Sequence, residues 1–163
     1  MSIRNAAPQD VEEIIRIEAV CFPPAEAAQP DDVRARYAAF PENFFVYEQD
    51  GRIAGFINGC TTDAPELPDA LYHDASLHRP DGAYQTVFGL DVLPEYRKNG
   101  IGGQLIRHYV ATARARGKKG VVLTCKERLI PYYASFGFED EGLSASTHGN
   151  VAWHQMRLSF GKA

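Results

Sequence analysis

A basic, glycine-rich turn at residues 92–105 constrains the fold of this 163-residue chain more than any other feature. It reads Val-Leu-Pro-Glu-Tyr-Arg-Lys-Asn-Gly-Ile-Gly-Gly-Gln-Leu. Before it, residues 84–93 have the composition of a strand, and Pro94 cannot continue a strand's hydrogen-bonded ladder. After it, apolar residues recur at helical spacing as far as about residue 116. The segment therefore predicts a strand, a tight turn and an amphipathic helix in direct succession.

This turn has the chemistry of an anion site. The first turn of a helix exposes unpaired N–H groups and a partial positive charge, which together bind phosphates. Gly100, Gly102 and Gly103 leave the backbone accessible, and Arg97 and Lys98 add positive charge. The spacing lacks the Gly-Lys-Ser/Thr of a P-loop and the third glycine of a dinucleotide fingerprint. On the glycines alone, a turn without a ligand fits equally well.

The rest of the chain alternates between strand and helix patterns and predicts a mixed α/β domain around one sheet. Residues 61–82 hold three prolines with little periodicity and are expected to form a long loop, a kind of segment that is often functional. Apolar spacing and turn residues indicate helices at 8–20, 31–39, 101–116 and 128–135, and strands at 3–6, 43–49, 52–60, 84–93, 121–123, 138–141 and 151–159.

Composition narrows the class of protein. A length of 163 residues suits one domain, here residues 1–163, and a formal net charge of -4 does not favour nonspecific nucleic-acid binding. The N-terminus has no hydrophobic signal core, and no apolar run approaches the roughly 20 residues that span a bilayer. Cys21, Cys60 and Cys125 form neither a metal-ligand spacing nor a disulfide framework. We therefore expect a cytoplasmic protein that needs no metal and binds neither nucleic acid nor membrane.

The pattern Arg97-x-x-Gly100-x-Gly102, with Val92-x-Pro94 before it, resembles the pyrophosphate loop of the GNAT superfamily of N-acetyltransferases. The resemblance covers nearly the whole chain. It implies a mostly antiparallel central sheet flanked by helices, with strands 4 and 5 splayed to hold acetyl-CoA as cosubstrate. The implied coenzyme contacts are Leu90, Asp91 and Val92 along the strand, and Arg97, Lys98, Asn99, Gly100, Ile101, Gly102 and Gly103 in the loop.

A second segment, residues 125–138, carries aromatic residues at helical spacing. Core packing accounts for Tyr132, Phe136 and Phe138. The same segment resembles the apolar-Tyr-x-x-x-Gly-Phe stretch of GNAT enzymes, which implies that Tyr133 is the general acid that protonates the departing thiolate. A tyrosine pKa near 10 keeps that proton in place at neutral pH.

Within the superfamily, the chain is most similar to the serotonin (arylalkylamine) N-acetyltransferase subfamily. The similarity lies in residues 125–138, in Leu-His-Arg-Pro at 77–80 and in Gly-Arg-Ile-Ala-Gly-Phe-Ile at 51–57. Vertebrate members carry two histidines on the strand before the loop, and these relay the proton of the amine. Thr86 and Phe88 occupy those positions here, and neither can act as a base.

The acceptor side of the site is less clearly marked in the sequence. Some group or water must take a proton from the amine, and the candidates Glu26, His73, Asp74, His78 and Asp91 are not separated by the sequence. Phe22, Pro23 and Tyr72, with His78, are expected to line an acceptor pocket, although ordinary loop packing explains them equally well.

We therefore expect an enzyme that moves the acetyl group of acetyl-CoA directly to a primary amine, with a small arylalkylamine as the favoured acceptor. A GNAT enzyme acting on a peptide, a polyamine or an antibiotic amine is the first alternative. A non-catalytic acyl-CoA-binding module is the second. The terminal strands offer sheet edges through which a homodimer can form.

Overall fold

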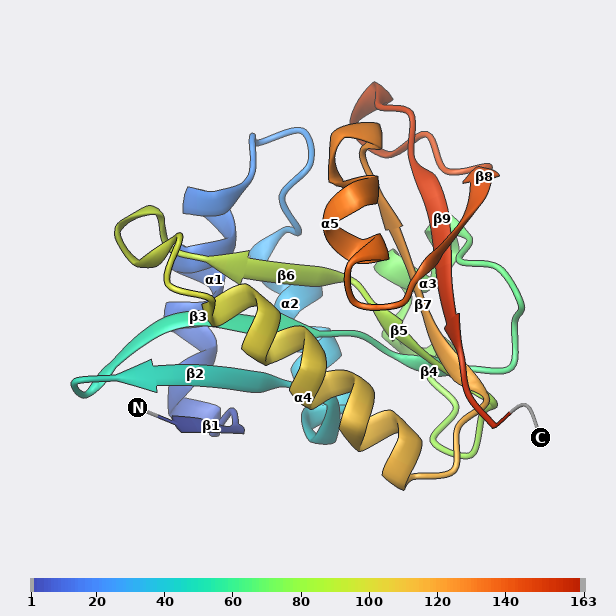
Figure 1. The fold of residues 1–163 in the computed structure, drawn as a ribbon. Helices are drawn as coiled ribbons and strands as arrows, with labels where there is room; N and C mark the ends of the chain where they lie inside the picture. The colour runs from blue at the N-terminus through green and yellow to red at the C-terminus, as the bar shows by residue number, and fades with distance from the viewer. Residues whose placement is uncertain (1, 162–163) are drawn as a thin grey trace.

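The computed structural model describes residues 2–161, which form two sheets that meet side by side (Figure 1). The first sheet is antiparallel throughout, in the order β1 (Ser2–Asn5), β2 (Phe45–Gln49), β3 (Arg52–Asn58) and β6 (Gly89–Val92). The second has the order β4 (Thr61–Thr62), β5 (Tyr84–Val87), β7 (Gly120–Cys125), β9 (His154–Ser159) and β8 (Glu139–Leu143). Its β5–β7 pair is parallel, and its other pairs are antiparallel.

Helices cover both faces of the first sheet (Figure 1). On one face, α4 (Ile101–Ala115) packs its apolar side, including Leu105, Ile106 and Tyr109, onto the strands. On the other, α1 (Val11–Cys21) and α2 (Pro30–Ala39) enclose a second apolar cluster that includes Ile14 and Phe56. The short helices α3 (Asp69–His73) and α5 (Ile130–Ala134) lie beside the second sheet. This layering confirms the mixed α/β fold, with two sheets in place of the one that the sequence predicted.

Most of the expected elements are present, with shifted ends. Pro8 opens a 3-10 turn at Pro8–Asp10, and α1 starts only after it. Helix α2 begins at Pro30, one residue before its expected start at Asp31. The segment expected as a plain loop at 61–82 contains β4, α3 and the 3-10 turn Ala75–Leu77. No helix within residues 2–161 is long and apolar enough to cross a membrane.

The largest difference from the sequence-based expectation concerns residues 84–93. They form two strands with different partners, because the pairing changes at Phe88. Up to Val87, the chain runs parallel to β7, with Val87 opposite Leu123. From Gly89 on, it pairs with β3 and leaves the end of β7 without a neighbour on that side. The two strands therefore diverge, and a gap opens between β6 and the last residues of β7.

Candidate active site

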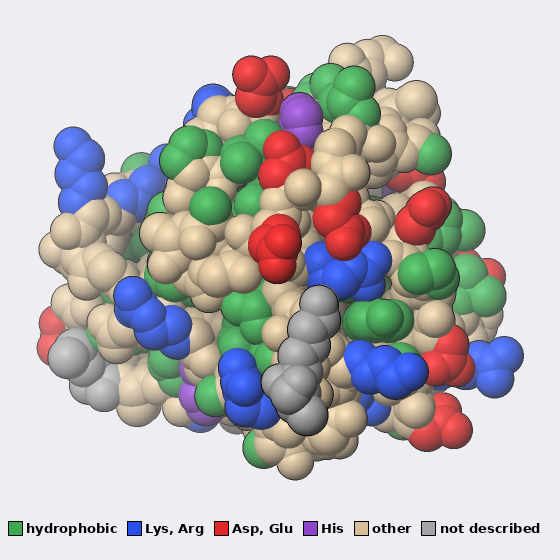
Figure 2. All heavy atoms as spheres, turned by 45° about the vertical axis from the view of Figure 1, so that its right-hand side comes forward, with side chains coloured by type: hydrophobic (Ala, Val, Ile, Leu, Met, Phe, Trp, Pro, Cys, Tyr) green, Lys and Arg blue, Asp and Glu red, His purple; other side chains and the backbone are tan. Residues whose placement is uncertain are grey.

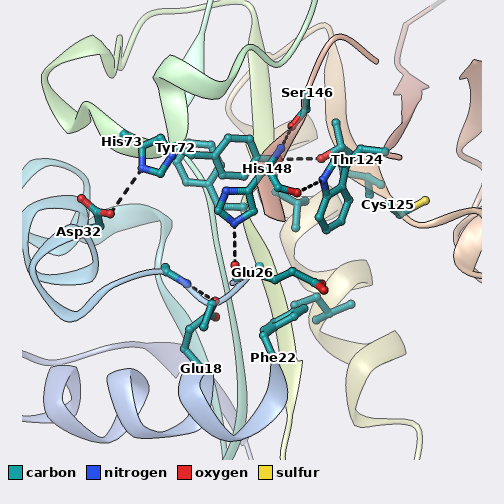
Figure 3. A pocket seen from close by; sticks show the side chains of 18 of the residues that line it. Glu18, Phe22, Glu26, Asp32, Tyr72, His73, Thr124, Cys125, Ser146 and His148 are labelled. Atoms are coloured by element: carbon teal, nitrogen blue, oxygen red, sulfur yellow. Dashed lines mark hydrogen bonds and ion pairs between the residues drawn. The ribbon is translucent and has the colours of Figure 1, made fainter. Parts of the chain in front are cut away.

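A cavity of about 200 Å³ opens where β6 and β7 diverge. Its walls come from α1 and the loop that follows it, α2, α3, the junction of β5 and β6, the end of β7, α5 and residues 146–153. Figure 3 shows Glu18 and Phe22 on the α1 side, with Tyr72 and His148 across from them. Segments far apart in the sequence thus form one chamber.

Tyr133 lines this cavity from α5 and is 8% exposed. Its ring packs edge-on against Tyr132 and Phe138, with ring centroids 5.2 Å and 6.0 Å away. Burial raises the pKa of its phenol well above the usual value, and the neighbouring Tyr132 adds to the rise. The phenol therefore keeps its proton throughout the neutral range, which is the state that a general acid needs.

The glycine-rich turn leads into α4 as expected, and Gly100 is the residue that precedes the helix. Its φ of +75° lies in the left-handed region that favours glycine, and a Cβ there would meet no atom within 4 Å. Lys98 also has a positive φ, 69°. The backbone at Gly100 is thus open to solvent at the positive end of a 15-residue helix.

The other two glycines have a packing reason. A Cβ on Gly102 would lie 2.8 Å from the hydroxyl of Tyr132, and one on Gly103 would lie 3.3 Å from both Phe136 and Arg107. The segment that contains α5 therefore approaches the start of α4 closely.

The expected coenzyme-strand residues alternate between two sides of β6. Leu90 and Val92 pack with the apolar cluster on the α4 side, and Leu90 also lines the cavity. Asp91, which is 1% exposed, is directed to the α1 side. Arg97 donates from Nε to the carbonyl oxygen of Val92 at 2.9 Å and so anchors the turn to the strand. Asn99 donates to the carbonyl of Tyr96 at 3.2 Å.

Two of the four expected acceptor residues line the cavity. Phe22 lies at its wall, and Tyr72 packs on Phe88 at a centroid distance of 4.6 Å and shares a 2.8 Å hydrogen bond with Thr124. Pro23 and His78 are outside the lining. His78 accepts from the backbone N–H of Thr61 at 3.0 Å and meets Glu42 at 3.1 Å, so it holds a loop in place.

The candidate proton acceptors are now distinguishable by position. Glu26 lines the cavity, and its Oε1 lies 2.8 Å from Lys126 Nζ in an ion pair without hydrogen-bond geometry. His73 lines it as well, 3.5 Å from Asp32, with half of its side chain exposed. Asp74 is outside the lining and caps the 3-10 turn through Ser76. Asp91 lies behind the lining residue Gly89.

Several lining residues were missed by the sequence reasoning, among them Glu18, Arg36, His148 and Trp153. Glu18 had a signal, since a carboxylate on the apolar face of a helix is unusual. Arg36 is 6% exposed and lies over the Phe88 ring, 4.7 Å from its centroid. His148 donates from Nε2 to the carbonyl of Glu26 at 2.8 Å, and Trp153 donates to the carbonyl of His148 at 2.8 Å. No local pattern marks these last two.

Comparison with known proteins identifies the family to which this chain belongs. The model of the Acetyltransferase (GNAT) family matches residues 11–138. A serotonin N-acetyltransferase of Mesocricetus auratus is 28% identical over 160 residues, which cover 96% of this chain and 76% of that protein. The uncharacterized N-acetyltransferase YkwB of Bacillus subtilis (strain 168) is 30% identical over 117 residues, which cover 65% of this chain and 52% of that protein.

Solved structures share the fold. A GNAT family acetyltransferase from Brucella melitensis in complex with acetyl-CoA is 24% identical, with a TM-score of 0.64 over 99% of this chain and 88% of that one. The GphF GNAT-like decarboxylase in complex with isobutyryl-CoA is 22% identical, with a TM-score of 0.83 over 98% and 99%. The chain therefore belongs to the GNAT family of acetyltransferases and is an enzyme of that family.

Proposed function

We propose that this enzyme transfers the acetyl group of acetyl-CoA directly to a small primary amine with an aromatic ring. The observation that carries the proposal is the placement of Tyr133. Its protonated phenol lines the same cavity as an aromatic wall made by Phe22, Tyr72, Phe88 and Trp153. Such a wall favours an acceptor with its own ring. The similarity to serotonin N-acetyltransferases points the same way.

The residues around the gap fit the coenzyme. Strand β6 is the last strand of its sheet, so one of its edges is free to pair with an extended chain such as the pantetheine arm. The open backbone at Gly100 suits the pyrophosphate, with Lys98, Asn99, Ile101, Gly102 and Gly103 beside it. The bound coenzyme supplies a thioester. Leu90 and Val92 then orient it, Arg97 steadies the turn, and Tyr133 donates a proton to the leaving sulfur.

The test is thiol release from acetyl-CoA with a panel of amines, namely tryptamine, phenethylamine, spermidine, an aminoglycoside and short peptides. Wild type and Tyr133→Phe are compared, and Tyr132→Phe on the same helix is the matched control. We expect turnover with the two arylalkylamines and a loss of kcat of about 100-fold or more in Tyr133→Phe, with unchanged coenzyme binding.

The other outcomes discriminate between functions. Turnover of spermidine, the aminoglycoside or peptides alone would retain the chemistry and reject the aromatic acceptor. Tight coenzyme binding without turnover of any amine would identify a binding module. Full activity in Tyr133→Phe would remove the tyrosine from the mechanism.

A further inference from the structure

Two buried carboxyl groups converge beside Gly89, at the wall of the cavity. A Cβ built on Gly89 would lie 3.0 Å from Oδ1 of Asp91 and 3.6 Å from Oε1 of Glu18. Both side chains are nearly inaccessible, with exposed fractions of 1% for Asp91 and 8% for Glu18. Gly89 and Glu18 line the cavity. We call Glu18 and Asp91 the carboxyl pair.

The surroundings of Asp91 favour its protonated form. Neither oxygen of Asp91 accepts a hydrogen bond from any donor within residues 2–161, whereas Oε2 of Glu18 accepts the N–H of Ala28 at 2.9 Å. Burial raises the pKa of Asp91 well above its usual value, and the charge of the nearby Glu18 adds to the rise. A hydrogen bond between two carboxyl groups needs a proton on one of them. A proton shared by the two carboxyl groups therefore gives Asp91 a hydrogen-bond partner that it otherwise lacks.

The buried guanidinium of Arg36 opposes the rise in the pKa of Asp91. Arg36 from α2 is attracted to Glu18, and its charge lowers the pKa of Asp91. Its Nη2 donates to the carbonyl of Tyr72 at 2.8 Å, so the guanidinium is held in place. The thiol of Cys21 on α1 also faces the pair, and burial raises its pKa, so it remains neutral.

The carboxyl pair and the phenol of Tyr133 lie at the same cavity. Glu18 and Tyr133 both line it, and the charge of Asp91 contributes to the raised pKa of Tyr133. Figure 3 shows the Glu18 carboxyl at the α1 side of the cavity, bonded to the backbone of the following loop. The other lining carboxylates are engaged, because Glu26 meets Lys126 at 2.8 Å and Asp32 meets His73 at 3.5 Å.

We propose that Glu18 accepts the proton of the attacking amine and that Asp91 is the positioning residue that shares it. This inference rests on the proposed amine acetyltransferase function. The lone pair of the amine forms the C–N bond, and an N–H proton passes to the Glu18 carboxylate. The C–S bond breaks, its electron pair goes to sulfur, and sulfur takes the phenolic proton of Tyr133. Solvent then returns the proton of Glu18 to Tyr133.

The experiment measures kcat and kcat/KM against pH for wild type, Glu18→Gln and Asp91→Asn with the best amine of the panel. Glu18→Gln should lower kcat by about 100-fold or more. Asp91→Asn should remain active, with the acidic limb of the profile moved to lower pH, because a like charge has been removed. Either amide can donate a hydrogen bond to the remaining carboxylate, so both variants keep the contact. Glu12→Gln, on the exposed side of α1, is the matched control.

A second acceptor separates catalysis from structure. A weakly basic arylamine is neutral at the assay pH and gives an adduct that loses its proton readily to water. The defect of Glu18→Gln should therefore shrink with this acceptor, and acetyl-CoA binding should stay within about 2-fold of wild type.

Three results would overturn the inference. Activity of Glu18→Gln within about 3-fold of wild type across the pH range would exclude it as the base while leaving the acetyltransferase function intact. An unmoved acidic limb in Asp91→Asn would remove Asp91 from the proton path. A wild type that binds coenzyme and acetylates no amine would reject the proposed function and this inference together.

Discussion

Burial changes the proton affinity of side chains around the cavity in the direction that leaves each of them uncharged. It raises the pKa of Tyr133 and Asp91, and it lowers that of Arg36. The cause is the same each time, since a charge is less stable away from water. Arginine stays protonated in proteins even so. The result is a neutral phenol, a carboxyl group with a raised pKa and a fixed cation around one chamber.

At the residue scale, Asp91→Asn should flatten the pH dependence of the free energy of unfolding. The folded pKa of Asp91 lies above its ordinary value of 3.8, so between those two values the folded state binds more protons than the unfolded state. Stability from this group is complete below the ordinary value and is lost as the pH rises through the folded pKa. Asparagine does not titrate and removes this loss.

Urea unfolding at several pH values between about 5 and 9 measures the effect. The difference in stability between variant and wild type should change in favour of the variant as the pH rises. Parallel curves for the two proteins would show that Asp91 has the same pKa in the folded and unfolded states.

A short helix positions part of the site because longer elements pack against it. Helix α5 contains five residues, too few to be stable alone, and it is fixed by packing between the start of α4 and the second sheet. Pro131 lies in its first turn, where a missing N–H has no cost. The position of Tyr133 therefore depends on how closely α5 and the residues after it approach α4.

At the element scale, two alanine substitutions should differ in effect. Gly100→Ala places a Cβ on a left-handed residue and should cost about 1–2 kcal/mol of stability. Gly102→Ala meets only the outer end of Tyr132, a 39% exposed side chain that can turn away. Alanine also favours helix by about 1 kcal/mol over glycine, so this variant should stay within about 1 kcal/mol of wild type.

Chemical denaturation of the two variants under one condition measures the difference. Equal destabilisation would mean that the turn tolerates a Cβ at both positions alike. A larger loss at Gly102 would mean that Tyr132 is fixed by contacts on its exposed side.

At the scale of the whole molecule, a buried tyrosine of α4, the helix that packs on the first sheet, bonds to the second sheet. Tyr109 is 1% exposed, donates to the carbonyl of Thr86 at 2.6 Å and accepts from Gln85 Nε2 at 2.9 Å. These bonds hold β5 against α4 just before the strand changes partner at Phe88. On the face that Figure 2 presents, acidic and basic side chains are interspersed.

Tyr109→Phe should therefore lower the stability of the whole fold. The change leaves the Gln85 amide and the Thr86 carbonyl with one partner fewer in a buried place, at a cost of about 1–3 kcal/mol. Tyr132→Phe removes a half-exposed hydroxyl and is the control, with little expected change. Thermal unfolding of both variants checks the prediction, and equal midpoints would show that the junction does not depend on this hydroxyl.

The formation of a homodimer remains a prediction. Strands β1 and β6 end the first sheet and β4 and β8 end the second, so each sheet has edges. Leu143 in β8 is 69% exposed and carries apolar surface at one of them. Size-exclusion chromatography with light scattering distinguishes a monomer from the homodimer that these edges allow.

The sequence by itself determined the order of the longer helices and strands, the turn before α4 and the family. These features depend on local patterns, in which apolar periodicity, a proline and a few glycines act over neighbouring residues. It also placed Tyr133 on the helix that follows β7, because that motif is short and contiguous. The glycine-rich turn also leads into α4 as expected, while the packing reason for Gly102 and Gly103 depended on the segment that contains α5.

The tertiary structure alone decided which side chains meet in the cavity. Glu18 and Asp91 come together across 73 positions of the sequence, and His148 bonds to the backbone of Glu26 across 122. The change of partner at Phe88 likewise depends on which strands lie on either side of it. Such encounters follow from the packing of whole sheets and helices, and no short stretch of sequence contains them.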